Sequence, residues 1–434
     1  MSQSPPRRDE TAGVDLAHLR ERAATLARMQ RFEEALAACQ EIIAHRPADP
    51  EALNESGGLC MRLGRPHDAF TYYDRAVASA PEFAVLHINK GAALSALNRF
   101  PEALASFAAA ANVEPCRAEA HYNAALVHLR HGDFAAGWPG HEWRWRKADW
   151  AGRRRNFTAP LWLGKQSIEG KTILLHAEQG FGDTIQFVRY APLVARRGAR
   201  VILECPPELA ALLRSVEGVS QVIERGAALP FFDFHCPLMS LPLAFGTQLA
   251  TIPASVPYLR PDQMLLSKWR ARLPQTGRLR VGLCWTGSRE HLNDHNRSIP
   301  LASFASLLAV SGIDFVSMQK DVDPVQAEIL QDYGVLSLGR ELADFADTAA
   351  GLALLDLVVA VDTSVAHLAG AVGKVVALLL PFSPDWRWLL DRTDCVWYPT
   401  MRIFRQAALQ DWSEPVERLR QELAEAAERR MARS

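Results

Sequence analysis

The sequence predicts an α-helical solenoid followed by two α/β halves, each built on a parallel sheet. Two observations lead to this fold class. A 34-residue period runs through the first third of the 434-residue chain. From Gly170 onward, short apolar runs alternate with amphipathic helical stretches, a pattern typical of parallel βαβ units.

The period is carried by several positions at once. Prolines recur at 47, 81 and 115, and small residues at 35, 69 and 103 share the same spacing. Gln30, Gly64, Asn98 and Gly132 mark a position where the chain turns between two helices in a left-handed conformation. A 34-residue unit of two helices closed by a proline resembles the tetratricopeptide repeat (TPR).

Four such units fit residues 13–148, and the last one loses the pattern after Phe134. An atypical terminal unit is expected where a solenoid stops stacking. Stacked helix pairs form a concave surface, which favours binding of a protein or peptide partner over a purely structural spacer. We expect residues 1–12 to be a disordered N-terminus.

Composition excludes several classes of protein. The net charge is −1, which argues against a strongly basic nucleic-acid binder. Seven cysteines without a C-x-x-C pair indicate thiols in a reducing compartment. The N-terminus has no apolar signal region, and the longest apolar runs are too short to span a bilayer. We therefore expect a cytoplasmic protein without a membrane span.

Residues 149–169 form a junction, and the tryptophans and arginines around it invite two interpretations. Five of the eleven tryptophans and six basic residues lie within 138–162. Aromatic and basic residues in alternation can bind single-stranded nucleic acid. We favour packing of the tryptophans between two domains, with the arginines solvated or stacked on the rings.

The two halves are expected at 170–262 and 279–434, separated by a polar linker, and both read as Rossmann-like. Predicted strands of the first half cover 171–177, 200–205, 220–224 and part of 231–242. Those of the second half cover 279–285, 314–319, 335–338, 357–361 and 375–380. Ligands of such sheets bind beyond the carboxyl ends of the strands.

In the first half, the motif QGFGD (179–183) follows the first strand. Gly180 and Gly182 allow the backbone to approach a ligand closely. Asp183 then opens a helix. It is either an N-terminal cap that accepts backbone N–H bonds or a general base that deprotonates a substrate hydroxyl, and the pattern alone does not separate the two.

In the second half, VDTSVAHLAG (361–370) places Asp362, Thr363 and Ser364 at the start of a helix, with His367 one turn further on. Free backbone N–H groups at such a terminus favour an anion such as a diphosphate. The competing interpretation is a plain cap and a buried core histidine.

The long polar loop 285–300 contributes Thr286, Ser288 and Arg297, and an arginine there can pair with a phosphate. Gln319, at the end of the next strand, completes the candidate set. The letters HLNDH (291–295) also suggest a metal, but they lack tetrahedral ligand spacing. We expect neither a metal nor a cofactor.

GDTIQFVRYAP (182–192), the 286–300 loop and DTSVAHLAGA (362–371) together resemble family 9 glycosyltransferases of the heptosyltransferase type, over roughly 170–400. The resemblance implies a GT-B fold, in which Asp183 activates the acceptor hydroxyl. It also implies that Asp362, Thr363, Ser364, His367 and Arg297 hold the diphosphate of a nucleotide-sugar donor. The sequence departs from the family at Ser364, where glycine is usual, and in 381–406, where G-P-T is missing.

TPR units joined to a GT-B domain resemble protein O-glycosyltransferases. That architecture implies transfer of a hexosyl or heptosyl group, without a metal, to a hydroxyl of a polypeptide held by the TPR groove. The alternative is a TPR scaffold with a non-catalytic GT-B domain.

Overall fold

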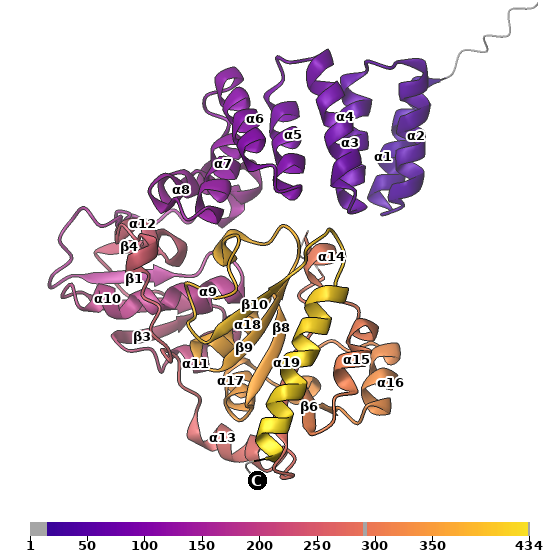
Figure 1. Cartoon of the computed structure of the whole chain (residues 1–434). Helices are drawn as coiled ribbons and strands as arrows, with labels where there is room; N and C mark the ends of the chain where they lie inside the picture. The colour runs from indigo at the N-terminus through magenta and orange to yellow at the C-terminus, as the bar shows by residue number, and fades with distance from the viewer. Residues whose placement is uncertain (1–14, 290–292, 433–434) are drawn as a thin grey trace, which may run out of the picture. The chain divides into compact units, whose positions relative to one another are not determined.

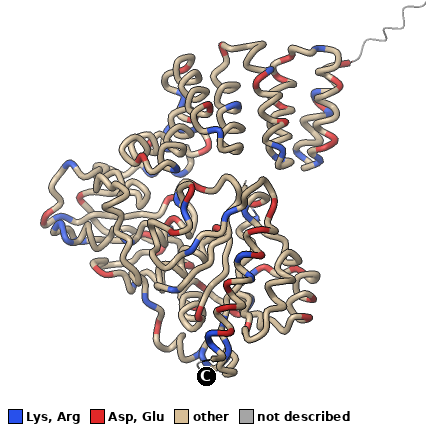
Figure 2. Tube along the Cα trace, viewed as in Figure 1, with Lys and Arg blue, Asp and Glu red and all other residues tan. Residues whose placement is uncertain are grey.

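The computed structural model describes residues 15–289 and 293–432 and divides the chain into two compact units, 1–127 and 128–434 (Figure 1). The predicted fold class, an α-solenoid followed by two parallel-sheet halves, is confirmed. Basic and acidic residues are interspersed along the chain rather than gathered in one segment (Figure 2).

The solenoid consists of paired antiparallel helices. In order they are α1 (Leu16–Arg28), α2 (Phe32–His45), α3 (Pro50–Arg62), α4 (Pro66–Ser79), α5 (Ala84–Ala96), α6 (Phe100–Val113) and α7 (Ala118–Arg130), and α8 (Phe134–His141) follows in the second unit. All four predicted turn residues have positive φ, from 57° at Asn98 to 76° at Gly132. The left-handed turns read from the period are thus confirmed.

Close helix contacts explain why the period alternates small and aromatic residues. A Cβ on Gly57 would stand 2.5 Å from Tyr73 Cε1, and one on Gly91 would stand 2.4 Å from Phe107 Cε1. Each pair lies one repeat from the other, and both aromatic side chains are buried. The glycines therefore let the rings of the second helix lie against the backbone of the first.

The second unit contains two separate all-parallel sheets. The first has the order β3-β2-β1-β4, with β1 (Thr172–His176) in register with β2, so that Leu174 faces Ile202. Its other strands are β2 (Arg200–Cys205), β3 (Val219–Glu224) and β4 (Phe234–Pro237), and its helices are α9 (Phe181–Phe187), α10 (Ala191–Ala195), α11 (Pro207–Leu213) and α12 (Leu241–Ala244).

The second sheet has the order β10-β9-β8-β5-β6-β7. Its strands are β5 (Leu279–Cys284), β6 (Ile313–Ser317), β7 (Leu336–Ser337), β8 (Leu357–Val361), β9 (Val375–Leu380) and β10 (Met401–Arg405). Its helices are α14 (Asp294–Arg297), α15 (Ala305–Leu308), α16 (Pro324–Asp332), α17 (Phe345–Ala353), α18 (Ser364–Ala371) and α19 (Ser413–Met431), and α13 (Gln263–Arg270) lies in the linker.

Two features differ from the sequence-based expectation. The helix expected over 184–198 begins earlier, at Phe181, and is interrupted at 188–190 before α10, in which Pro192 occupies the first turn. Strand β10 and helix α19 lie in the last fifty residues, for which no element was predicted. Helix α19 buries Leu419 and Leu423 against the second sheet and completes its core.

Candidate functional site

The N-terminus of α18 lies directly beyond β8 and has no side-chain cap. Thr363 is the N-cap residue, with extended backbone (φ −143°). Its hydroxyl lies 3.8 Å from Cys284 Sγ at the end of β5. The backbone N–H groups of the first turn are the donors that an anion would use at such a terminus.

Arg297 is anchored beside this terminus. Its Nη1 donates to the carbonyl oxygen of Asp362 at 3.0 Å, and its Nε donates to Asp294 Oδ1 at 3.2 Å. A Cβ on Gly287 would stand 2.3 Å from Arg297 Nη2, so glycine leaves the room that the guanidinium occupies. The candidate cation and the candidate helix terminus are therefore in direct contact.

Gln319 joins the ends of β5 and β6. Its Oε1 accepts from the backbone N–H of Thr286 at 3.2 Å and lies 3.5 Å from Cys284 Sγ. Burial raises the pKa of Cys284 to about 11, so the thiol stays protonated. Cys284 thus connects Gln319 with Thr363 at the carboxyl edge of the sheet.

Asp362 and His367 lie side by side, with His367 Nε2 3.9 Å from Asp362 Oδ1. Burial, together with repulsion from Asp385, raises the pKa of Asp362. Burial, with Arg387 nearby, holds the pKa of His367 well below its usual range. The imidazole is therefore neutral, and its Nδ1 lies 3.0 Å from the hydroxyl of Tyr398.

The QGFGD motif of the first half packs directly on this region. Gly180 is the N-cap residue of α9, and its N–H donates to Asp183 Oδ2 at 2.9 Å. A Cβ on Gly182 would stand 2.8 Å from His367 Cδ2 and 3.6 Å from Ser364 Cα. The starts of α9 and α18 therefore meet across the boundary between the two halves.

Asp183 is not the N-cap residue but the third residue of α9. It accepts from the N–H of the cap residue, and its other oxygen forms an ion pair with Arg387 of the second half. The N-cap interpretation is therefore wrong, although the carboxylate does accept a backbone N–H at the helix start, and the general-base interpretation stays a prediction.

The structure brings most candidates together and leaves one at the periphery. Asp183 is connected to Asp362 and His367 through Gly182 and Arg387, and Arg297, Gln319 and Thr363 adjoin them. Ser288 is exposed on its loop. Of the suggested metal motif, His291 and Leu292 lie outside the described residues. In the described part of the chain, no group of three His, Cys, Asp or Glu side chains is placed to hold a metal ion.

Arg387 and Asp385 were not among the site residues predicted from the sequence. Both lie in 381–406, which was noted only for lacking the family's G-P-T. Arg387 belongs to the 3₁₀ helix Trp386–Trp388 and is only 7% exposed. The local signal was a charged residue between two tryptophans, which indicates a buried charge but does not identify its partner.

The tryptophan- and arginine-rich residues pack onto the first half, as the packing interpretation requires. Trp138 Nε1 donates to the carbonyl of Thr247 at 3.0 Å. Arg144 is fully buried and pairs with Glu178 at 3.1 Å, beside Ser240. Burial raises the pKa of Glu178 to about 7, although Arg144 opposes the shift.

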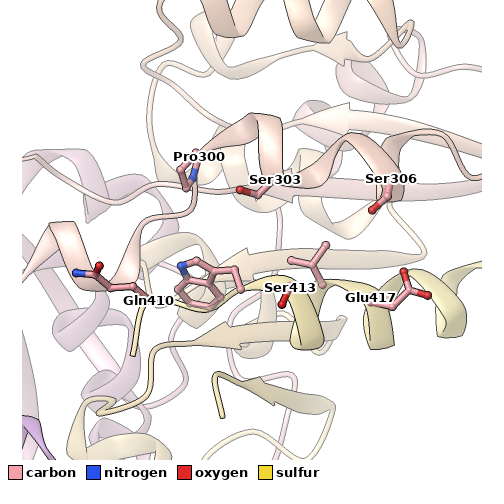
Figure 3. A pocket seen from close by; sticks show the side chains of 8 residues that line it. Pro300, Ser303, Ser306, Gln410, Ser413 and Glu417 are labelled. Carbon is pink, nitrogen blue, oxygen red and sulfur yellow. The ribbon is translucent and has the colours of Figure 1, made fainter. Parts of the chain in front are cut away.

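A separate pocket of about 490 Å³ lies between the segment after the 285–300 loop and the start of α19. Figure 3 shows Ser303 and Ser306 on one side of it and Ser413 and Glu417 on the other. The carboxylate of Glu417 forms an ion pair with Arg420. The lining contains none of the candidate site residues.

None of the helices in 15–289 and 293–432 combines the length and the apolar character needed to cross a bilayer.

Comparisons with known proteins cover both parts of the chain. Protein FlbA of Caulobacter vibrioides is 25% identical over 412 residues, which span 88% of this chain and 68% of FlbA. The Escherichia coli ADP-heptose lipopolysaccharide heptosyltransferase II aligns over 59% of this chain and 99% of its own, with 15% identity and a TM-score of 0.44. A family 9 glycosyl transferase from Veillonella parvula aligns over 62% of this chain and 99% of its own, with 11% identity and a TM-score of 0.43. Residues 20–82 and 88–137 match the tetratricopeptide repeat family, so the N-terminal region of the chain consists of tetratricopeptide repeats.

Proposed function

We propose that this protein is a glycosyltransferase that moves a sugar from a nucleotide-sugar donor to an acceptor hydroxyl. The observation that carries the proposal is the contact between the QGFGD turn and the start of α18. A Cβ on Gly182, which directly precedes Asp183, would stand 3.6 Å from Ser364 Cα. Arg297 of the same half as α18 donates to the carbonyl of Asp362, just before the uncapped terminus. A base and an anion site face each other in this way where a hydroxyl displaces a diphosphate.

In the proposed reaction, Asp183 accepts the proton of the acceptor hydroxyl. The acceptor oxygen forms a bond to the sugar carbon that carries the diphosphate, and the bond from that carbon to the diphosphate oxygen breaks. The nucleoside diphosphate leaves with the electron pair. Backbone N–H groups of α18 and the guanidinium of Arg297 stabilise the added negative charge, so that no metal ion is called for.

The acceptor in this proposal is a protein or peptide bound by the tetratricopeptide repeats. Stacked helix pairs present a concave surface suited to an extended polypeptide. The support is architectural, because the repeats occupy residues 20–137 of the same chain as the candidate site.

A TPR scaffold with a non-catalytic second unit is the competing function. It is favoured by the ion pair between Asp183 and Arg387, since the candidate base is occupied by the protein's own side chain.

The test is to incubate the full chain with ADP-, UDP-, GDP-, dTDP- and CMP-linked sugars. Thermal stability measures binding, and release of free nucleotide measures turnover. We expect one donor class to raise the melting temperature of the chain. We also expect free nucleotide to be released from that donor in the presence of EDTA. A chain that is stabilised by none of these donors and releases no nucleotide is a scaffold.

A further inference from the structure

Arg387 is held on three sides by hydrogen bonds. Its Nη1 donates to Asp385 Oδ1 at 2.8 Å, its Nε donates to Gln186 Oε1 at 2.7 Å, and its Nη2 pairs with Asp183. The guanidinium carbon also lies 4.3 Å from the centre of the Trp386 ring. Such a side chain has little freedom to change its position.

The contacts of Arg387 cross the boundary between the two halves. Asp385 neighbours Arg387 in the second half, whereas Asp183 and Gln186 both belong to α9 of the first half. Burial disfavours the charged guanidinium, but the carboxylates of Asp385 and Asp183 outweigh it and raise the pKa of Arg387 further. A permanent positive charge of the second half therefore lies against a carboxylate of the first.

The carboxylate of Asp183 is oriented from both halves. Oδ2 accepts from the backbone N–H of Gly180, and Oδ1 accepts from Arg387. About a fifth of the side chain (20%) is still exposed.

We propose that Arg387 is the positioning residue of Asp183, and that its guanidinium holds the carboxylate in one orientation only while the two halves are packed together. The inference rests on the proposed function, because it assigns Asp183 the role of base. It adds that the base of the first half is completed by a residue of the second half. Separation of the halves would then switch the base off.

The test compares R387Q, R387K and the control Q186L in the full chain. Gln186 contacts the same guanidinium across the same boundary but carries no charge. Turnover is followed over pH as nucleotide release from whichever of the five donor classes the wild type uses. Binding is followed with the corresponding free nucleotide.

In R387Q, the acidic limb of the kcat/KM profile should move to higher pH by about one to three units, because a nearby opposite charge favours the ionised carboxylate by that amount. At neutral pH, kcat should fall by about tenfold or more, and the Kd of the free nucleotide should change less than about threefold. R387K keeps the charge and loses the fork geometry, so its limb should stay in place while kcat falls. Q186L should leave the limb unmoved.

If the acidic limb does not move in R387Q, or moves equally in Q186L, the inference is wrong and the Arg387–Asp183 ion pair is only structural. If R387Q loses much of its nucleotide affinity while kcat is unchanged, the inference is also wrong, and Arg387 is a ligand-binding residue. If R387Q turns over at the wild-type rate and its acidic limb does not move, the positioning role is wrong and the proposed function is unaffected. If the wild-type chain itself releases no nucleotide, the proposed function and the positioning role are both wrong. Should R387Q fail to fold, R387K must lower kcat more than Q186L does, and equal effects contradict the inference.

Discussion

Gly182 lies so close to the imidazole of His367 that a Cβ on residue 182 would stand 2.8 Å from His367 Cδ2. This contact joins the start of α9 to the start of α18, and thus the first half of the second unit to the second half. Because the His367 ring is buried beside Trp388 and Tyr398, it has little room to move away.

We therefore expect Gly182→Ala to separate the two helix starts and to destabilise the protein by about 1–3 kcal/mol, the usual cost of overpacking. Gly180→Ala is the matched control. It lies two residues away, is exposed, and its Cβ would meet only Asp183 Oδ2 at 3.4 Å. Thermal unfolding of both variants tests this, and equal stability of the two would show that the contact is soft.

The second prediction concerns the anion site. Arg297→Ala and Thr363→Ala should each weaken nucleotide binding while the fold is retained. For Arg297 the loss should be about tenfold or more, since hydrogen bonds to a charged group are worth about 1.5–3 kcal/mol. Arg289→Ala is the control, because Arg289 lies on the same loop and its side chain is 76% exposed. Calorimetric titration measures the Kd, and an equal loss in all three variants would indicate a non-specific charge effect.

Much of the fold could be predicted because its signals are local. The 34-residue period repeats the same packing of a glycine against an aromatic ring, as at Gly57 and Tyr73, so it survives in the sequence as a regular pattern. The buried parallel strands read as apolar runs, and β2, β8 and β9 were predicted at their observed bounds.

The site could be predicted where its residues lie in a segment that follows a strand. Thr363 and Gln319 lie two residues beyond β8 and β6, and Arg297 belongs to the polar loop that follows β5, where ligands of such sheets bind. Arg387 could not be found in this way, because its partner Asp183 lies 204 positions away in the sequence. The pairing of two charges between two sheets depends on how the halves pack, which no local pattern records.

The third prediction concerns where the chain can be shortened. A chain that begins at His128 should keep nucleotide binding and lose transfer to a protein acceptor, because it lacks the repeats of the first unit. A chain that begins at Gly152 also loses Arg144, which leaves the buried carboxylate of Glu178 without its partner. We expect this shorter chain to be the less stable one.

Thermal unfolding compares the two shortened chains, and incorporation of labelled sugar into protein compares each with the full chain. Undiminished transfer by the chain that begins at His128 would show that the repeats do not select the acceptor.

The fourth prediction concerns acid stability. His176 Nε2 lies 3.3 Å from His235 Nδ1 in the first half. Burial lowers the pKa of His176 to about 3 and that of His235 to about 4, with Arg155 and, for His176, the neighbouring His235 also opposing protonation. Histidines of the unfolded chain have pKa values near 6.5. Between pH 6.5 and the lower pKa values of the folded state, the unfolded chain therefore binds more protons than the folded one. Stability is therefore full above about pH 6.5 and is lost as the pH falls toward 4 and 3.

His176→Phe keeps an aromatic ring beside Phe157 but removes one titrating group. The drop in melting temperature between pH 6.5 and 4 should be smaller in this variant than in the wild type. His67→Gln, at an exposed position of the first unit, should leave the drop unchanged. Identical pH profiles for His176→Phe and the wild type would assign the acid sensitivity to other groups.

The last prediction separates the two roles of Asp183. In Asp183→Asn, the amide oxygen can still accept the N–H of Gly180, so the helix start should be retained. The charge opposite Arg387 is lost, although Asp385 still neutralises the guanidinium, and a modest fall in melting temperature is expected in either role. Turnover distinguishes the two roles, because loss of a general base should lower kcat by about 10²–10⁴-fold with little change in nucleotide Kd.

Asp344→Asn is the control, since Asp344 caps α17 by accepting the N–H of Ala346 and Asp347, and asparagine caps equally well. Wild-type turnover in Asp183→Asn would remove Asp183 from the chemistry and leave it as a partner of Gly180 and Arg387 alone.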